Sequence, residues 1–266
     1  MKLLFDIGTK KELNAASHVL LIETGENHFA FAIAGYDDKL VKRVGYFLNE
    51  TDDDDFISSL RQQYPFLNNQ YFKKVNSCYL PDTLLLPAKF FKADDVQKIY
   101  EAVYGKGQQS LVSEPLEAWQ VYFLYRQSAI FHNHPTDFLH AFAVTLKSVN
   151  DLQAENLLVD FKTDRFSVVA IREGKLLAAQ IYSYTTGEDV LYWLLKICRQ
   201  FSFSLQSVYV ELGGLIEKNS AMYELLHQYF HTIHFSGTNG MKLAPELTEY
   251  PEHFFSSLYK LVSCVL

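Results

Sequence analysis

The sequence predicts an α/β protein built from two similar halves, each with helices on both faces of a mixed β-sheet, and with a cleft between the halves. Residues 20–34 can be laid over residues 157–171 without a gap. Each segment holds the first two strands of a similar order: three strands, helix, strand, helix, strand and helix. A chain of 266 residues with 48% hydrophobic residues is ample for a buried core. We expect the halves to span residues 1–150 and 151–266.

The repeat is clearest in a β-hairpin near the start of each half. Phe29 falls on Phe166 in the gapless alignment, and Tyr46 meets Tyr182 once a one-residue slip is allowed. Both copies are rich in residues that favour strands and turn at polar residues, which is typical of paired strands. We therefore expect equivalent three-stranded units at 18–48 and 156–184.

The first half has a clear helix signal after its three strands. Thr51 is placed to cap a helix whose first turn holds Asp52–Asp55, and acidic side chains at a helix N-terminus interact favourably with its dipole. The other expected elements are strands at 18–24, 28–35, 40–48, 73–80, 83–88 and 118–125, a helix at 93–104 and helical segments over 128–150.

The second half repeats the order with a shorter chain. Its first two strands, 156–161 and 165–172, are joined by the polar turn Lys162-Thr163-Asp164, whose lysine we interpret as solvated. Residues 185–189 supply a cap and an acidic first turn for a helix over 190–203. The other expected elements are strands at 175–184, 207–212 and 231–235, a helix near 217–230 and a terminal helix over 251–265.

This duplicated order resembles the ribonuclease H-like fold shared by actin, Hsp70 and the sugar kinases. The whole chain also resembles an uncharacterised Bacteroidetes family, a domain of unknown function with an actin-like ATPase fold. Members of that family open with a segment similar to Leu4-Phe5-Asp6 and carry the hairpin His18–Ala34 and its echo at Leu157–Ile171. The resemblance implies an actin-like ATPase architecture of two ribonuclease H-like (βββαβαβα) halves.

The resemblance also implies that two hairpin turns, one per half, hold the phosphates of ATP, each with an Asp-x-Gly pattern. Glycines let backbone N–H groups approach a phosphate. The first turn here, Glu23-Thr24-Gly25-Glu26-Asn27, keeps a glycine but adds a second acid. The second turn, residues 160–164, lacks a glycine, and Phe161 stands beside the phosphate position, so both turns are interpreted as degenerate. The candidate cofactor-binding residues in them are Glu23, Thr24, Gly25 and Asp160.

A further candidate is the pair Gly213-Gly214, which matches the adenosine-binding glycine pair between a strand and a helix in such proteins. A strand that ends in paired glycines ahead of a helix N-terminus lets a planar ring or a phosphate approach the backbone. The alternative, which we favour, is a tight strand-to-helix turn needed for packing.

Other motifs are interpreted as structural. The segment Phe5–Thr9 contains the Asp-x-Gly-Thr pattern of a phosphate turn, but it precedes the hairpin that the repeat identifies, so we interpret it as a leading segment. The pairs His132/His134 and His231/His234 lack the ligand spacing of zinc sites, so no metal is expected. No nucleophile–base arrangement stands out, and catalytic residues stay unassigned.

Charge and cysteine usage exclude several classes of partner. The chain has 24 Lys and Arg against 31 Asp and Glu, and a net charge of −7 argues against nucleic acid. Its apolar stretches are shorter than the ~18 residues of a membrane span, and the N-terminus lacks the features of a signal peptide. Cys78, Cys198 and Cys264 are interpreted as reduced, buried thiols, so we expect a cytoplasmic protein.

These features lead us to expect a non-catalytic, actin-like binding or scaffold protein, a pseudo-ATPase without a cofactor. It would hold an unidentified protein partner through its cleft or an aromatic surface, since aromatic residues are 15% of the chain. An aromatic-rich core would use the same residues. The alternative function is a diverged nucleotide-binding ATPase or small-molecule kinase that binds ATP through the candidates in the two turns and through Gly213-Gly214.

Overall fold

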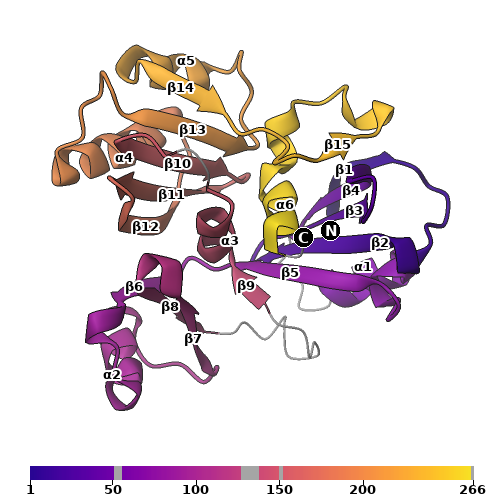
Figure 1. Ribbon diagram of the computed structural model, residues 1–266, viewed down its shortest axis with the longest axis horizontal. Coiled ribbons are helices and arrows are strands. Elements are labelled where there is room, and N and C mark those ends of the chain that lie inside the picture. The colour runs from indigo at the N-terminus through magenta and orange to yellow at the C-terminus, as the bar shows by residue number, and fades with distance from the viewer. Residues whose placement is uncertain (51–55, 127–137, 150–151, 265–266) are drawn as a thin grey trace.

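The computed structural model describes residues 1–50, 56–126, 138–149 and 152–264, which form two large sheets and a small one (Figure 1). The first sheet contains β1 (Lys2–Gly8), β2 (His18–Gly25), β3 (His28–Gly35), β4 (Leu40–Leu48), β5 (Lys73–Tyr79), β9 (Phe138–His140) and β15 (Lys242–Leu243). The second contains β10 (Glu155–Phe161), β11 (Arg165–Arg172), β12 (Lys175–Ser183), β13 (Tyr209–Gly214) and β14 (Thr232–Phe235). The third contains β6 (Thr83–Pro87), β7 (Leu111–Leu116) and β8 (Val121–Arg126). The helices are α1 (Phe56–Gln63), α2 (Ala93–Tyr104), α3 (Ala141–Lys147), α4 (Gly187–Phe201), α5 (Ala221–Tyr229) and α6 (Ser256–Lys260).

The two large sheets repeat one strand order. Neighbouring strands run β4-β3-β2-β5-β9 in the first sheet and β12-β11-β10-β13-β14 in the second. The strands β2, β3 and β4 pair antiparallel, as do β10, β11 and β12. The remaining strands join in parallel, β5 and β9 beside β2, and β13 and β14 beside β10. The predicted duplication and the mixed α/β fold of two ribonuclease H-like halves are therefore confirmed.

The strand register confirms one predicted equivalence and corrects another. Phe29 and Phe166 are each the second residue of the strand that follows the hairpin turn. Tyr46, however, matches Ile181 in its sheet position rather than Tyr182. The cause is the next turn, which has four residues before β4 and two before β12, so the alignment slips by two residues.

Both faces of each large sheet are covered, which explains why the strands are apolar along most of their length. One face of the first sheet packs against α6 and the C-terminal segment, and the other packs against α1 and the chain that follows it. The second sheet packs against α4 and α5 on one face and against α3 and the small sheet on the other. Helices α3 and α6 consequently lie between the two large sheets (Figure 1).

The C-terminal segment returns from the second sheet to the first. Strand β15 pairs with β4, and α6 contacts β2 and β3 as well as β13. The predicted single helix over 251–265 is wrong, because α6 has five residues between the 3-10 turns Glu252–Phe255 and Leu261–Cys264. Half of the described side chains of this segment are buried, so tertiary packing rather than one amphipathic face sets its shape. The division of the chain at residue 150 stays a prediction.

The small sheet is inserted between β5 and β9. The predictions of a strand at 83–88 and a helix at 93–104 are confirmed by β6 and α2, and the strand expected at 118–125 is β8. The sequence pattern does not predict strand β7, because this strand contains Pro115, whose nitrogen cannot donate a hydrogen bond to a neighbouring strand. Its place at the edge of the sheet order β6-β8-β7 accommodates that proline.

Some expected features lie outside the described residues, namely Thr51, Asp52–Asp55, His132 and His134. Of the helical segments expected over 128–150, α3 is confirmed, and the short strand β9 precedes it. Three residues are too few to show strand periodicity, so only the pairing with β5 defines β9. Among the described residues, Cys78 and Cys198 are buried free thiols and Cys264 is a partly buried one. No helix in this described part is long and apolar enough to cross a membrane.

His140 joins β9 to α3 and is completely buried. Its Nδ1 accepts a hydrogen bond of 3.1 Å from the Phe142 N–H, which caps α3. Its Nε2 lies 2.8 Å from Thr83 Oγ1 and 3.2 Å from the Leu80 carbonyl oxygen. Burial lowers the pKa of His140 to about 4, so the ring is neutral in the folded protein at neutral pH.

We expect His140 to make the protein less stable as the pH falls from 6.5 towards 4. The unfolded chain takes up this proton near pH 6.5 and the folded chain only near pH 4, so acidification favours unfolding in that window. Protonation of this histidine in the unfolded chain should lower the free energy of unfolding by about 2 kcal/mol between pH 7 and pH 5. Urea unfolding of the wild type and of His140→Asn, which keeps a capping acceptor, measures the difference. An equal pH slope in both proteins would contradict the prediction.

Candidate functional site

The two hairpin turns predicted to hold phosphate lie directly against each other. Arg165 Nη1, just after the second turn, donates to Glu26 Oε2 of the first turn at 2.5 Å. Asn27 Nδ2 of the first turn donates to Asp164 Oδ2 of the second at 3.2 Å. These contacts join segments that are more than a hundred residues apart in the sequence, so the two halves meet at their turns.

Lys162 is the centre of this contact. Its ammonium lies 2.6 Å from Glu23 Oε1 and 2.9 Å from Asp160 Oδ2, and it donates to Ser257 Oγ at 3.1 Å. It also lies 5.3 Å from the centre of the Tyr79 ring. The side chain is only 3% exposed, so the prediction of a solvated lysine is wrong. Glu23 reaches Lys162 from the other half, which the local sequence could not indicate. Lys162 and these partners are called the Lys162 cluster below.

The Lys162 cluster is charged at neutral pH despite its burial. Burial raises the pKa of Glu23, but the Lys162 ammonium and His28 outweigh it and lower that pKa to about 2. His28 Nε2 lies 3.1 Å from Glu23 Oε1. Burial lowers the pKa of Lys162, but the carboxylates of Asp160 and Glu23 outweigh it and raise that pKa above its ordinary value. Glu23 and Lys162 therefore stabilise each other's ionised forms.

The cavity that the described residues form beside the cluster is small. The cavity that borders Glu23, Tyr79 and Asp160 has a volume of about 10 Å³, roughly that of one water molecule. Binding sites for small molecules usually have volumes of about 300–1,000 Å³. Within the described residues Asp160 Oδ1 has no hydrogen-bond partner, and a single water in this cavity would satisfy it.

The structure places the other candidates of the two turns in the packed interior. Thr24 is buried in β2 beside the candidate Glu23, and Gly25 is the last residue of that strand. Phe161 is completely buried in the core under α4. The prediction that Phe161 stands beside the phosphate position is therefore wrong, because its side chain points into the core of the second half while Lys162 faces the first.

Gly213 and Gly214 occupy the last two positions of β13, and α5 begins only at Ala221. The helix expected near 217–230 therefore follows the glycines as predicted but begins four residues later than expected. A Cβ atom on Gly213 would lie 2.5 Å from Ser256 Oγ, and one on Gly214 would lie 2.1 Å from the Phe161 carbonyl oxygen. Both glycines thus pack against the protein's own chain, which favours the packing interpretation. A role in binding a cofactor stays a prediction.

The Lys162 ammonium offsets part of the negative charge of this site from inside the protein. The two acids that would lie near a nucleotide's metal ion, Glu23 and Asp160, are bound to an ammonium group instead. Among the residues that the structure describes, no group of three or more His, Cys, Asp or Glu side chains could hold a metal ion. The sequence feature that indicates this ion-paired arrangement is Lys162, which stands in the turn where the resemblance implies an Asp-x-Gly pattern.

Fold and site together define a protein with the actin-like ATPase fold whose two phosphate-turn positions contact each other. Residues 8–233 match the family described as "protein of unknown function (DUF3822)", and the chain belongs to that family. The predicted resemblance to a domain of unknown function is thereby confirmed. Among curated proteins, none matches the chain significantly.

Solved structures support the same fold at low sequence identity. A Bacteroides thetaiotaomicron protein with actin-like ATPase fold and unknown function has a TM-score of 0.72 and 14% identity over 93% of this chain and 96% of that one. The PilM–PilN complex of type IV pilus biogenesis has a TM-score of 0.56 and 12% identity, over 95% of this chain and 100% of that one. The cytoplasmic domain of EpsL, an inner-membrane component of the type II secretion system of Vibrio cholerae, has a TM-score of 0.50 and 8% identity over 94% and 96%.

Proposed function

We propose that this protein is a non-catalytic, actin-like binding or scaffold protein whose nucleotide cleft is closed by the Lys162 cluster. The observation that carries the proposal is the Lys162 ammonium, bound to one carboxylate from each half. In a nucleotide-bound relative a metal ion supplies the positive charge near such acids. Here the protein supplies that charge itself and fills the space with side chains.

Catalysis of phosphoryl transfer needs a positioned phosphate and charge stabilisation around it. Removing one well-placed donor typically costs 10²–10³ in rate. In this chain the second turn has no glycine for backbone approach, and its lysine is bound to acids of both halves. Both observations support a protein without ATPase activity.

Exposed aromatic side chains support binding to a protein partner. In the pair Tyr71-Phe72 the phenylalanine is buried and Tyr71 is 75% exposed, and in the pair Phe90-Phe91 the first ring is 57% exposed. Aromatic residues are enriched at protein interfaces because they bury a large area at low entropic cost. A chain of the PilM–PilN complex of type IV pilus biogenesis has a similar fold, which supports the same kind of role.

The alternative, a diverged ATPase or small-molecule kinase, rests on the actin-like ATPase fold and on the acids Glu23 and Asp160 at the two turns. Opening of the Lys162 cluster by Mg-ATP would be needed for it. The two functions therefore predict different responses to nucleotide.

We expect the purified protein to hydrolyse ATP no faster than a buffer blank, with or without magnesium, and to show no thermal shift with Mg-ATP. A ligand at 100 times its dissociation constant adds about 2.7 kcal/mol of stability, which a melting experiment detects readily. Turnover that disappears in Asp160→Ala but persists in the exposed control Asp95→Ala would establish the ATPase instead. Saturable binding without turnover, weakened by Gly213→Val, would indicate a nucleotide sensor and contradict the closed cleft.

A further inference from the structure

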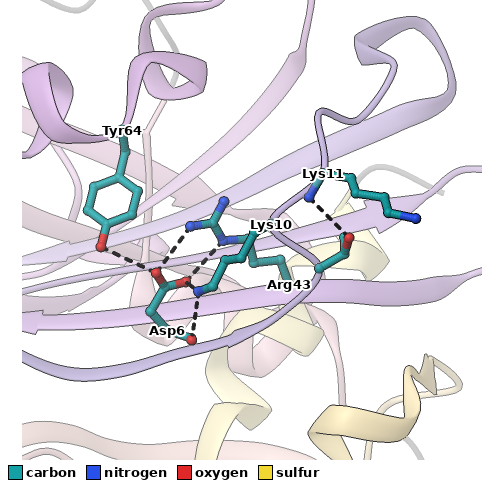
Figure 2. Close-up of polar contacts among 6 residues, drawn as sticks. Asp6, Lys10, Lys11, Arg43 and Tyr64 are labelled. Carbon is teal, nitrogen blue, oxygen red and sulfur yellow. Dashed lines mark hydrogen bonds and ion pairs between the residues drawn. The ribbon is translucent and has the colours of Figure 1, made fainter.

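A second polar cluster lies at the edge of the first sheet, around Asp6 of β1 (Figure 2). Asp6 Oδ1 accepts a hydrogen bond from Arg43 Nε at 3.0 Å and lies 2.6 Å from Lys10 Nζ. Asp6 Oδ2 accepts from Arg43 Nη2 at 3.1 Å and from the Tyr64 hydroxyl at 3.4 Å. One carboxylate thus holds two cationic side chains, Lys10 and Arg43, in fixed positions.

The segment Phe5–Thr9 builds this arrangement. Gly8 has a φ of +99°, and a Cβ atom there would lie 2.1 Å from the Lys42 carbonyl oxygen, so a glycine is required where β1 leaves β4. The turn brings Lys10 back to Asp6, whose carbonyl oxygen accepts a hydrogen bond from Lys10 Nζ at 2.8 Å. The segment is therefore more than a leading segment, because it also holds Lys10 and Arg43 side by side at Asp6.

The two cations border a cavity of about 360 Å³, which is within the usual range for small-molecule sites. Lys11 and Glu12 add charges to its wall. The apolar part of the wall consists of Leu13, Ile33, Pro65, Phe66 and Phe72. The Arg43 guanidinium lies 5.2 Å from the centre of the Phe66 ring, so a positive charge and an aromatic surface are held next to each other.

The charges around the cavity select the ligand. Lys10, Lys11 and Arg43 face the acids Asp6 and Glu12, which leaves one positive charge in excess at this place in a chain of net charge −7. One excess positive charge complements a singly charged carboxylate better than a doubly charged phosphate, because like and unlike charges must balance where solvent is partly excluded. The apolar wall, in turn, is suited to an apolar body.

We propose that this cavity binds an organic carboxylate with an apolar body. The carboxylate lies at Lys10 and Arg43, and the body packs against Phe66 and Phe72. Asp6 is a positioning residue, since it acts through the two cations it holds. A free carboxylic acid and the carboxylate end of a peptide chain share this chemistry. The Lys162 cluster takes no part, so the proposal does not depend on the state of the nucleotide cleft.

The test titrates 4-phenylbutyrate, and separately its neutral counterpart 4-phenylbutanol, into the full chain, with binding followed by NMR chemical shifts. We expect saturable binding of the acid with a dissociation constant on the order of 1 mM, and binding of the alcohol at least about tenfold weaker. N-acetyl-glycyl-phenylalanine, compared with its C-terminal amide, tests the second source. Tighter binding of this acid than of 4-phenylbutyrate identifies a peptide end, and weaker binding identifies a free acid.

Two variants locate the site. Lys10→Met should weaken binding of 4-phenylbutyrate about tenfold, whereas Lys98→Met on the distant helix α2 should leave it unchanged. Both lysine side chains are more than half exposed, so both variants should fold. Glu12→Gln should tighten binding because it removes an opposing charge. Equal binding of acid and alcohol, no saturation by the acid, or unchanged binding in Lys10→Met would overturn the proposal.

Discussion

Lys162→Met is expected to lower the free energy of unfolding by about 3–5 kcal/mol, the usual cost of breaking a buried ion pair by removal of one partner. Methionine keeps the aliphatic stem, so the change is mainly the loss of the ammonium group. Glu23, which is 1% exposed, and Asp160 would then be left in the interior with no lysine between them. The cost arises from two carboxylates without a compensating charge rather than from lost packing.

Urea unfolding of the wild type and the variant measures this loss, and the exposed Lys98→Met is the matched control. The Lys98 side chain is 81% exposed and lies 3.6 Å from Asp95, so its replacement should change stability by less than about 0.5 kcal/mol. Adding Glu23→Gln to Lys162→Met should recover part of the loss, because it removes one of the uncompensated charges. A loss below about 1 kcal/mol in Lys162→Met would show that the cluster does not hold the two halves together.

Gly214→Ala is expected to cost more than about 3 kcal/mol and to reduce the yield of folded protein. Gly214 has a φ of +75°, a conformation that costs other residues roughly 1–2 kcal/mol. The added Cβ would also lie 2.1 Å from the Phe161 carbonyl oxygen and 2.7 Å from the Phe161 nitrogen. Both are backbone atoms of the neighbouring strand β10, which cannot move aside without breaking the pairing with β13.

Gly174→Ala separates the two contributions. Gly174 has a φ of +70°, close to that of Gly214, but nothing lies within 4 Å of a Cβ placed there. Its replacement should therefore cost only the conformational part, about 1 kcal/mol. Equal losses of stability in the two variants, measured by urea unfolding, would show that the close approach of β13 to β10 does not require glycine.

Much of the fold follows from short-range patterns in the sequence. The helix expected from residues 185–189 is α4, and the cap expected among them is Thr186, which forms reciprocal hydrogen bonds with Asp189. The hairpin in each half could be predicted because its strands and turn lie within about 20 residues and show their own propensities. The slip of Tyr46 onto Ile181 could not, since it depends on the length of the turn that precedes the third strand in each sheet.

The candidate site divides in the same way. Glu23 and Asp160 could be found because they are matching positions of an internal repeat, and the structure brings both to one lysine. The environments of Phe161 and Lys162 do not follow from the sequence. A turn by itself does not reveal that the Phe161 side chain enters the core and that the Lys162 side chain contacts the other half. The cavity beside Arg43 also joins the chain after β1, strands β3 and β4, and the chain after α1, which no local motif connects.

The sequence by itself determined the duplicated strand order, the bounds of the hairpins and of α2, and the two acids at matching positions of the repeat. These properties depend on periodicity, capping and turn residues, which act between neighbours along the chain. Only the tertiary structure decided that Lys162 is buried, that the C-terminal segment returns to the first sheet, and that Gly213 and Gly214 pack against their own chain. Each of these is set by contacts between residues that lie far apart in sequence, where the balance of charge and volume exists only once the two halves have come together.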